Sequence, residues 1–405
     1  MQWAMKAARL YDGTRQAMTQ DAVVLMENTR IAAVGPASSV GLPPDMEVVD
    51  LGDRTIMPGL IDAHVHILFT GGPKSGEESR SMSDNQALLT GVQNAQLGLR
   101  SGLTTVRDCG DRNYLSLELR DFINAGHLTG PRIVCSGPVI TTTAGQLWWS
   151  GIECDTDDDL RRAVRTLVKN RVDFIKLMGS GGNATPGSNP EVSQYNISGF
   201  QAVTQDAHRM GKKVAAHVHG VDSIRLAVQA GIDTLEHVPF RTEGTIEYDP
   251  RLVDEMIEKD LVVSLAMPAT WYRLRAEDMI DIRAHPQHLW TQRYDTIRRM
   301  FEAGVKLVVS SDQGSTSTRI DELALLMDFL VRELELPALE MLYGVTGLAA
   351  QALGIDEELG TLSPGKIADI VVLDGDPGVD ITALQRVHQV IKDGRVVVRD
   401  GALTS

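Results

Sequence analysis

Short apolar runs rich in β-branched residues recur along the middle of this chain, and stretches of helical periodicity separate most of them. Continuous apolar runs are typical of strands buried on both faces, as in a parallel sheet. Eight such strands alternating with helices can form a (β/α)8, TIM-like barrel. We therefore predict an α/β fold with a barrel over residues 57–358. The eight runs are GLIDAHVHI, LTTVRDCG, RIVCSGPVI, DFIKLMGS, VAAHVHG, DTLEHVPF, LVVSLAMP and KLVVSSDQG.

The two ends of the chain have a different texture, with short alternating strands punctuated by turn pairs such as Asp-Gly and Pro-Gly. Each end is too short to build a stable sheet by itself. We therefore expect residues 1–56 and 359–405 to form one small composite β-sandwich domain.

Charge and cysteine content limit the classes of partner. The 405 residues carry a formal net charge of −15, which repels phosphate backbones and anionic lipid surfaces. The three cysteines lack CxxC spacing, so a disulfide framework or a thiolate metal site is disfavoured. The sequence starts without a basic and apolar leader, and no 18-residue apolar run occurs. We expect a cytoplasmic protein that binds a small molecule, without nucleic acid or membrane.

Residues able to bind a metal follow several of the predicted strands. Active sites of such barrels lie at the carboxyl ends of the strands, where distant parts of the chain converge. His64 and His66 are two positions apart, so one strand end can direct both at a single ion. Neutral imidazoles with a carboxylate suit Zn²⁺ or a similar divalent ion. The candidate ligands are His64, His66, Lys176, His217, His237 and Asp312.

These motifs make the chain resemble the amidohydrolase superfamily over essentially its whole length. The segments that carry the resemblance are PGLIDAHVH, TTVRD, FIKLM, VAAHVHG, DTLEHV, VVSSD and GTLSPGKIADIVVLD. Within that superfamily the chain is most similar to the imidazolonepropionase-related branch, which includes Xaa-Pro dipeptidases (prolidases) and N-acyl-amino-acid hydrolases.

The resemblance implies a binuclear metal site. Lys176 would be carboxylated by CO₂ and bridge two Zn²⁺ or similar ions; a lysine that binds a substrate carboxylate is the alternative. His64, His66, Lys176 and Asp312 would hold one ion, and Lys176, His217 and His237 the other. A hydroxide bridging the ions would be the nucleophile, and Asp312 would pass its proton to the leaving nitrogen. The segment HVHG lacks the glutamate that deaminases of the superfamily carry after this histidine, which disfavours deamination.

Substrate contacts are expected from the loops. Relatives commonly have a histidine where this chain has Gln146, which keeps hydrogen-bonding capacity but does not titrate. Trp148, with its neighbour Trp149, could wall the pocket or cap the barrel rim. His219 either contacts substrate or is packed, and Tyr195 and Tyr272 are the remaining candidate contacts.

Three functions are compatible with these residues. The first is hydrolysis of the C–N bond of an Xaa-Pro dipeptide or N-acyl amino acid by a homo-oligomeric enzyme. The second is hydrolysis of a cyclic amide, carbamate or aryl urea, which Gln146 and the tryptophans would permit. The third is a catalytically silent metal-binding scaffold; every expected ligand is present, which argues against it.

Overall fold

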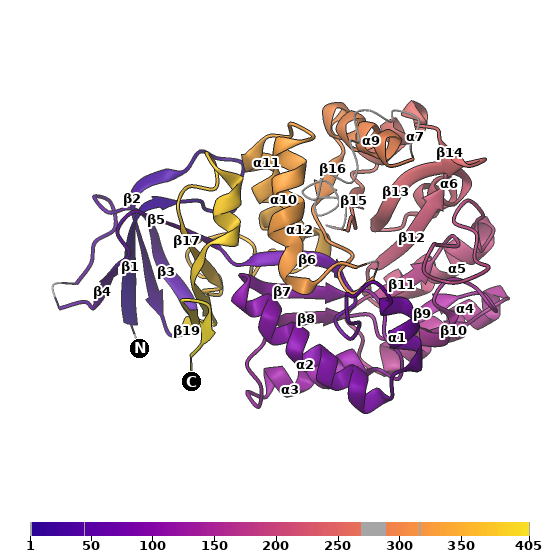
Figure 1. Cartoon of the computed structure of the whole chain (residues 1–405), viewed down its shortest axis with the longest axis horizontal. Helices are drawn as coiled ribbons and strands as arrows, with labels where there is room; N and C mark the ends of the chain where they lie inside the picture. The colour runs from indigo at the N-terminus through magenta and orange to yellow at the C-terminus, as the bar shows by residue number, and fades with distance from the viewer. Residues whose placement is uncertain (1, 44, 269–288, 316, 405) are drawn as a thin grey trace.

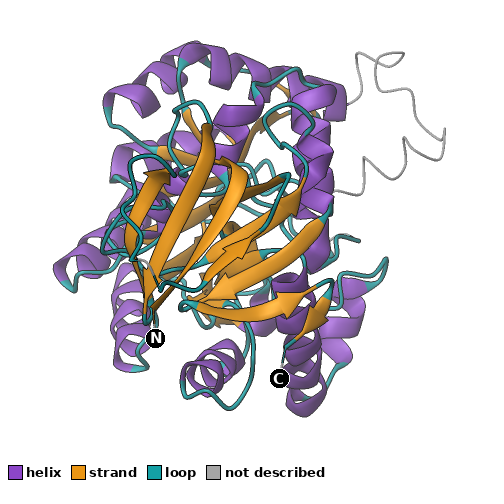
Figure 2. Cartoon of the chain, turned by 90° about the vertical axis from the view of Figure 1, so that its left-hand side faces the viewer, coloured by secondary structure: helices purple, strands orange, loops and turns teal. Residues whose placement is uncertain are grey.

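The computed structural model describes residues 2–43, 45–268, 289–315 and 317–404. Strands from both ends of the chain meet in one nine-stranded sheet, at the left of Figure 1 and facing the viewer in Figure 2. Its strands are β1 (Gln2–Leu10), β2 (Thr19–Glu27), β3 (Arg30–Pro36), β4 (Val48–Asp50), β5 (Arg54–Pro58), β17 (Ile370–Asp374), β18 (Val387–Lys392), β19 (Arg395–Arg399) and β20 (Ala402–Leu403).

The two chain ends are joined by antiparallel pairing of β5 with β17, in which Ile56 lies opposite Val372. Both side chains belong to a buried cluster of this β-rich domain. The composite origin of the domain is therefore visible in the pairing. Hydrogen bonds link the described strands of this domain into a single sheet, so a sandwich of two separate sheets stays a prediction. The domain boundaries 1–56, 57–358 and 359–405 also stay predictions.

The middle of the chain holds parallel strands alternating with helices, consistent with a TIM-like barrel, and each of the eight predicted runs contains a strand. The third run is divided in two at residues 136–138. These strands are β6 (Leu60–Val65), β7 (Leu103–Asp108), β8 (Arg132–Cys135), β9 (Val139–Thr141), β11 (Ile175–Met178), β12 (Val214–Gly220), β13 (Thr234–Thr242), β15 (Val262–Ser264) and β16 (Lys306–Val308).

Parallel pairing orders these strands as β6-β7-β8 and as β9-β11-β12-β13-β15-β16. An isolated parallel bridge between Val65 and Gln313 connects the end of β6 to the segment after β16. Two short strands extend the second sheet, β10 (Gly151–Glu153) beside β9 and β14 (Thr245–Ile246) beside β13. Because the strands run in parallel, their carboxyl ends lie on one side of the molecule.

Helices cover the outside of these strands (Figure 1). Thr156 caps α4 by accepting a hydrogen bond from the Asp159 amide, and three aspartates occupy the first turn, where the helix dipole favours negative charge. The helices are α1 (Ser75–Ser81), α2 (Asp84–Arg100), α3 (Leu115–Asn124), α4 (Asp157–Lys169), α5 (Ile197–Arg209), α6 (Val221–Ala230), α7 (Pro250–Glu258), α9 (Leu289–Ala303), α10 (Leu323–Arg332), α11 (Ala338–Gly344) and α12 (Gly347–Leu353).

The cysteines and the helices concern the expectations about disulfides and about membrane-spanning segments. Cys109, Cys135 and Cys154 are buried and free. Within the described ranges, none of the helices combines the length and the apolar character needed to cross a membrane.

Candidate metal centre

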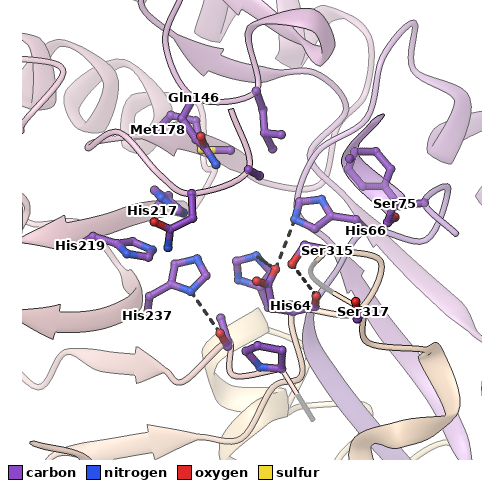
Figure 3. A pocket seen from close by; sticks show the side chains of 18 of the residues that line it. His64, His66, Ser75, Gln146, Met178, His217, His219, His237, Ser315 and Ser317 are labelled. Carbon is purple, nitrogen blue, oxygen red and sulfur yellow. Dashed lines mark hydrogen bonds and ion pairs between the residues drawn. The ribbon is translucent and has the colours of Figure 1, made fainter. Parts of the chain in front are cut away.

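A cavity of about 580 Å³ opens at the carboxyl ends of the parallel strands (Figure 3). All six residues predicted as metal ligands line it. They come from five segments that are far apart in the sequence, so the barrel topology brings them together. Each of the five histidines of the cavity is at least nine-tenths buried.

The first group of ligands lies between the end of β6 and the segment after β16. The Nε2 atoms of His64 and His66 are each 3.6 Å from Oδ1 of Asp312. Burial opposes ionisation of Asp312, but contacts with His66 and His64 outweigh it and hold the pKa of this carboxyl below its ordinary value. Asp312 is therefore a carboxylate at neutral pH, as a metal ligand or proton acceptor must be.

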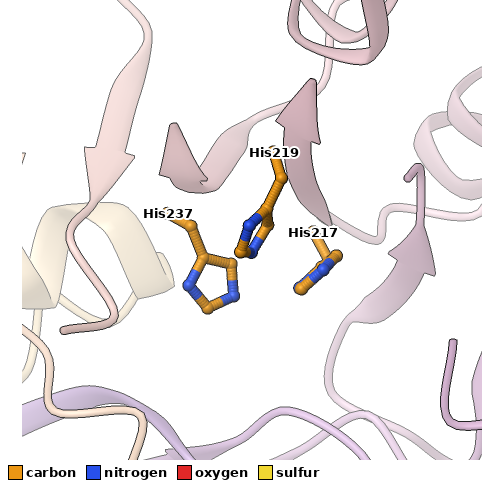
Figure 4. A group of neighbouring side chains, drawn as sticks. All are labelled: His217, His219 and His237. Atoms are coloured by element: carbon orange, nitrogen blue, oxygen red, sulfur yellow. The ribbon is translucent and has the colours of Figure 1, made fainter. Parts of the chain in front are cut away.

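The second group contains three histidines from β12 and β13 (Figure 4). Ligand atoms of His217, His219 and His237 lie within 4.8 Å of one another. The ring of His217 is 4.4 Å from that of His219 and 4.6 Å from that of His237 between centroids. Three imidazoles at this spacing can surround one divalent ion.

One nitrogen on each of the four predicted histidine ligands faces an acceptor of the protein. Nδ1 of His64 faces Glu236 at 2.6 Å and Nδ1 of His66 faces the Gly110 carbonyl at 3.4 Å. Nε2 of His217 faces the Gly181 carbonyl and Nδ1 of His237 the Ala266 carbonyl, both at 3.2 Å. An acceptor at one nitrogen places the proton there and leaves a lone pair on the other, which is the arrangement that a metal ligand needs.

Burial also keeps these imidazoles neutral. Burial first, and then the charge of Lys176, lower the pKa of His64 to about 4 and that of His217 to about 3. The pKa of His237 lies well below its ordinary value, again mainly through burial. Neutral imidazoles bind divalent cations without first losing a proton.

Lys176 on β11 is fully buried, and within the described part of the chain its Nζ has no hydrogen-bond partner. Its charge acts on His64 of the first group and on all three histidines of the second. Burial of an amine without a hydrogen-bond partner carries a desolvation cost. A carbamate on Nζ would instead be an anionic ligand that lines the same cavity as both groups. The histidines and Asp312 therefore fit divalent metal ions, and Lys176, without a partner among the described residues, lines the same cavity.

Glu236 and Arg107 support the first group, and Glu236 was not among the residues predicted from the sequence. Arg107 Nη2 donates to Oε1 of Glu236 at 2.6 Å, while Oε2 faces His64. Burial opposes ionisation of Glu236, but Arg107 and other cations depress its pKa far below the ordinary range. The resulting carboxylate orients the His64 ring.

Cys109 lies close to His64 and Glu236, but a thiolate metal site with these residues is disfavoured. Burial raises the pKa of the Cys109 thiol to about 12, so the thiol stays protonated at neutral pH.

Backbone geometry explains why Glu236 was missed. Adjacent residues of a regular strand face opposite sides, so Glu236 would point away if His237 pointed inward. His237 has φ 73°, a left-handed conformation that is rare outside glycine. Both side chains consequently approach His64: Glu236 by its hydrogen bond, and His237 at 5.1 Å between ring centroids. The only sequence signal was the charged residue itself within the run DTLEHVPF.

The predicted substrate contacts have different positions. Gln146 and His219 line the cavity; Oε1 of Gln146 and both ring nitrogens of His219 lack hydrogen-bond partners within the described residues. Trp148 is 43% exposed and is not among the lining residues, whereas Trp149 is. Tyr195 packs outside the cavity and donates its hydroxyl to the Cys154 carbonyl. Tyr272 lies outside the described residues.

Two of the candidate contacts, Trp148 and Tyr195, are not among the residues that line the cavity. The one-turn helix at Trp148–Ser150 turns Trp148 to the surface and its neighbour Trp149 to the cavity. Tyr195, in the segment between β11 and α5, packs against the hydrophobic core. Burial and hydrogen bonding decide both positions, and neither is apparent from residue type.

The sequence matches the amidohydrolase family over residues 55–397. The chain belongs to the amidohydrolase family. Family members act on small molecules, and this chain is accordingly a hydrolase that acts on carbon–nitrogen bonds.

Individual amidohydrolases are similar along most of the chain. An ochratoxinase of Aspergillus niger is 26% identical over 376 residues, which cover 84% of this chain and 75% of that protein. An imidazolonepropionase of Bacillus velezensis is 23% identical over an alignment that covers 95% of this chain and 91% of that protein. The crystal structure of a Xaa-Pro dipeptidase with bound methionine in the active site superposes with a TM-score of 0.85 at 27% identity, covering 98% of this chain and 99% of that one.

Proposed function

We propose that this amidohydrolase uses two divalent metal ions to cleave the amide bond of an Xaa-Pro dipeptide or an N-acyl amino acid. The observation that carries the proposal is Lys176. It is buried, its Nζ has no partner among the described residues, and it lines the same cavity as two groups of candidate metal ligands. In the proposed arrangement His64, His66, Lys176 and Asp312 bind one ion. Lys176, His217 and His237 bind the other, with a carbamate on Lys176 as the bridge.

Bound ions of this kind polarise a carbonyl and lower the pKa of water, which makes a nucleophile available at neutral pH. The protein's own contribution is the placement of acids, bases and dipoles around the reacting bond. Asp312 is ionised and contacts two histidines of the first group. It can accept the proton of the attacking water and deliver it to the leaving nitrogen, which must be protonated before the amine departs.

The cavity also bears on substrate size. Its volume of about 580 Å³ is within the range of small-molecule sites. Phe69, Leu147, Trp149 and Met178 form an apolar part of the lining, which suits a bulky acyl or side-chain group. The methionine in the active site of the related Xaa-Pro dipeptidase is an amino acid, as one product of either proposed substrate would be.

The second candidate function is hydrolysis of a cyclic amide, carbamate or aryl urea. Oε1 of Gln146, without a partner among the described residues, favours it, because a neutral amide can accept a hydrogen bond from a substrate N–H where a histidine of relatives would titrate. The silent scaffold is disfavoured, since all six ligands converge on one cavity. Zinc as the ion, a homo-oligomeric state and a cytoplasmic location stay predictions.

A hydrolysis screen after expression with zinc and bicarbonate tests the proposal. Dipeptides and N-acyl amino acids should be cleaved faster than lactams, carbamates and aryl ureas, and elemental analysis should find about two ions per chain. Lys176→Ala should lose both the activity and the bound metal. Lys169→Ala, on the exposed last turn of α4, is the matched control and should keep both. A fully active, metal-replete Lys176→Ala variant would refute the bridge.

A further inference from the structure

The cavity contains a second buried cation that the metal centre does not use. Arg293 on α9 lines the cavity and is 7% exposed. Its Nη2 donates to the Leu265 carbonyl at 2.8 Å, and its guanidinium lies 5.5 Å from the centroid of the Trp290 ring. Nε of Arg293 has no hydrogen-bond partner among the described residues.

The position of Arg293 relative to the ligands is determined by the end of β15. Leu265 accepts the hydrogen bond from Arg293, and the next residue, Ala266, accepts the one from Nδ1 of His237. The charge of Arg293 is felt at Asp312 and at His219. Arg293 therefore lines the same cavity as both groups of candidate metal ligands, on the side of β15.

An arginine in this environment is unusual because a buried guanidinium normally faces a carboxylate. Ion pairs of the described residues include many arginines, but none joins Arg293 to an aspartate or glutamate. Burial lowers the pKa of Arg293 to about 10, so the group stays charged at neutral pH. Its charge interacts with Asp312 at a distance, but its direct contacts are one backbone carbonyl and one aromatic ring, and Nε has no acceptor among the described residues. An anion in the cavity could supply that acceptor.

Lys74, Glu77 and Arg241 differ from Arg293 in exposure or in pairing. Lys74 and Glu77 line the mouth but are exposed, so water screens both. Arg241 is not among the lining residues, and it is held by Asn183 and Glu191. Arg293 thus combines burial, a place in the cavity and an unused donor.

We propose that Arg293 binds the carboxylate of the amino acid that is released when the amide bond is cleaved. This inference rests on the proposed function, whose substrates carry a free carboxylate on the leaving-group side, and it names the residue that recognises that carboxylate. Arg293 would then be a specificity-determining residue. A preference for a carboxylate argues against the neutral carbamates and aryl ureas of the second candidate function as substrates.

The first test uses the unchanged enzyme, loaded with zinc. An N-acyl amino acid and its carboxamide differ only in the charge of the group that Arg293 would bind. Loss of one partner of a buried charged pair costs about 2–5 kcal/mol, so kcat/KM for the carboxylate should exceed that for the carboxamide by roughly 30-fold or more. Equal values would overturn the assignment of Arg293 while leaving the amidohydrolase proposal intact. If neither of these compounds nor any other compound in the screen is hydrolysed, that result contradicts the proposed function itself.

The second test uses variants and a readout that needs no turnover. Arg293→Met should lower kcat/KM for the carboxylate about 30-fold more than for the carboxamide, and Arg293→Lys should restore part of the difference. Calorimetry should show that L-proline or L-methionine binds more tightly than its amide to the wild type, and that Arg293→Met removes this preference. Arg299→Met is the control, since Arg299 is on the same helix, outside the cavity lining, and pairs with Asp295. A preference that persists in a folded Arg293→Met variant would refute the proposal.

Discussion

Nδ1 of His64 lies 2.6 Å from Oε2 of Glu236, and the other oxygen of Glu236 accepts a hydrogen bond from Arg107. A histidine that ends one strand is thus oriented by a carboxylate from a strand on the other side of the cavity. This contact places the proton of His64 on Nδ1 and directs Nε2 toward Asp312.

Glu236→Gln should weaken metal binding. Glutamine is neutral and its single acceptor oxygen cannot serve both Arg107 and His64. Removing a partner of this kind typically reduces metal affinity about 10- to 100-fold. Competition with a chromophoric chelator measures the change. Glu358→Gln, at a half-exposed ion pair with Arg30, should bind metal normally; equal affinity in both variants would mean that Glu236 serves packing alone.

His219→Gln should keep both ions and lose catalytic efficiency. We propose His219 as a substrate contact, although its ring lies in the same group as His217 and His237. A lost hydrogen bond to substrate costs roughly 1–3 kcal/mol, or about 5- to 150-fold in kcat/KM. His217→Gln should instead lose an ion. Metal analysis of the two purified variants separates the roles, and loss of an ion from His219→Gln would make His219 a ligand.

Gly182→Ala should disturb His217 without changing any ligand. A Cβ at this position would lie 2.5 Å from Nε2 of Gln146 and 2.9 Å from Nε2 of His217, both closer than real contacts allow. Displacement of a site residue by about 1 Å can reduce the rate 10²-fold. Steady-state kinetics checks this, with Gly76→Ala as the control, because Gly76 lines the cavity and the atom nearest to an added Cβ would be 3.8 Å away.

Asp369→Asn should change how stability depends on pH. Asp369 is 5% exposed beside β17, and burial raises its pKa to about 6, while Arg132 acts in the opposite direction. A raised pKa means that the neutral form favours folding, so this contribution is present at low pH and is lost as the pH rises from about 4 through 6. A shift of about 2 units corresponds to roughly 3 kcal/mol.

Asparagine does not ionise, so the Tm of Asp369→Asn relative to wild type should rise over that pH window and then stay level. Scanning calorimetry between pH 4 and 8 measures the difference. Asp374→Asn, at a half-exposed ion pair with Arg54, should show no such trend. A difference that does not vary with pH would contradict the assignment to Asp369.

The sequence alone determined the parts of this protein that follow from local periodicity. Apolar runs and helical stretches located the parallel strands and most of the helices between them, since burial on both faces demands such runs. Two-residue spacing was enough to place His64 and His66 on one side of a strand end. The convergence of His217, His237 and Asp312 with them followed from the barrel rule alone.

Tertiary structure decided what depends on backbone irregularity and on contacts between distant segments. The left-handed conformation of His237 brings Glu236 into the site against the alternation of a regular strand. The carbonyl of Leu265 holds Arg293 in the cavity, although no periodicity distinguishes this arginine from others on its helix. A single helical turn exposes Trp148 and directs Trp149 to the cavity. These outcomes depend on hydrogen bonds and burial that exist only after the chain has folded, which is why residue type and spacing did not predict them.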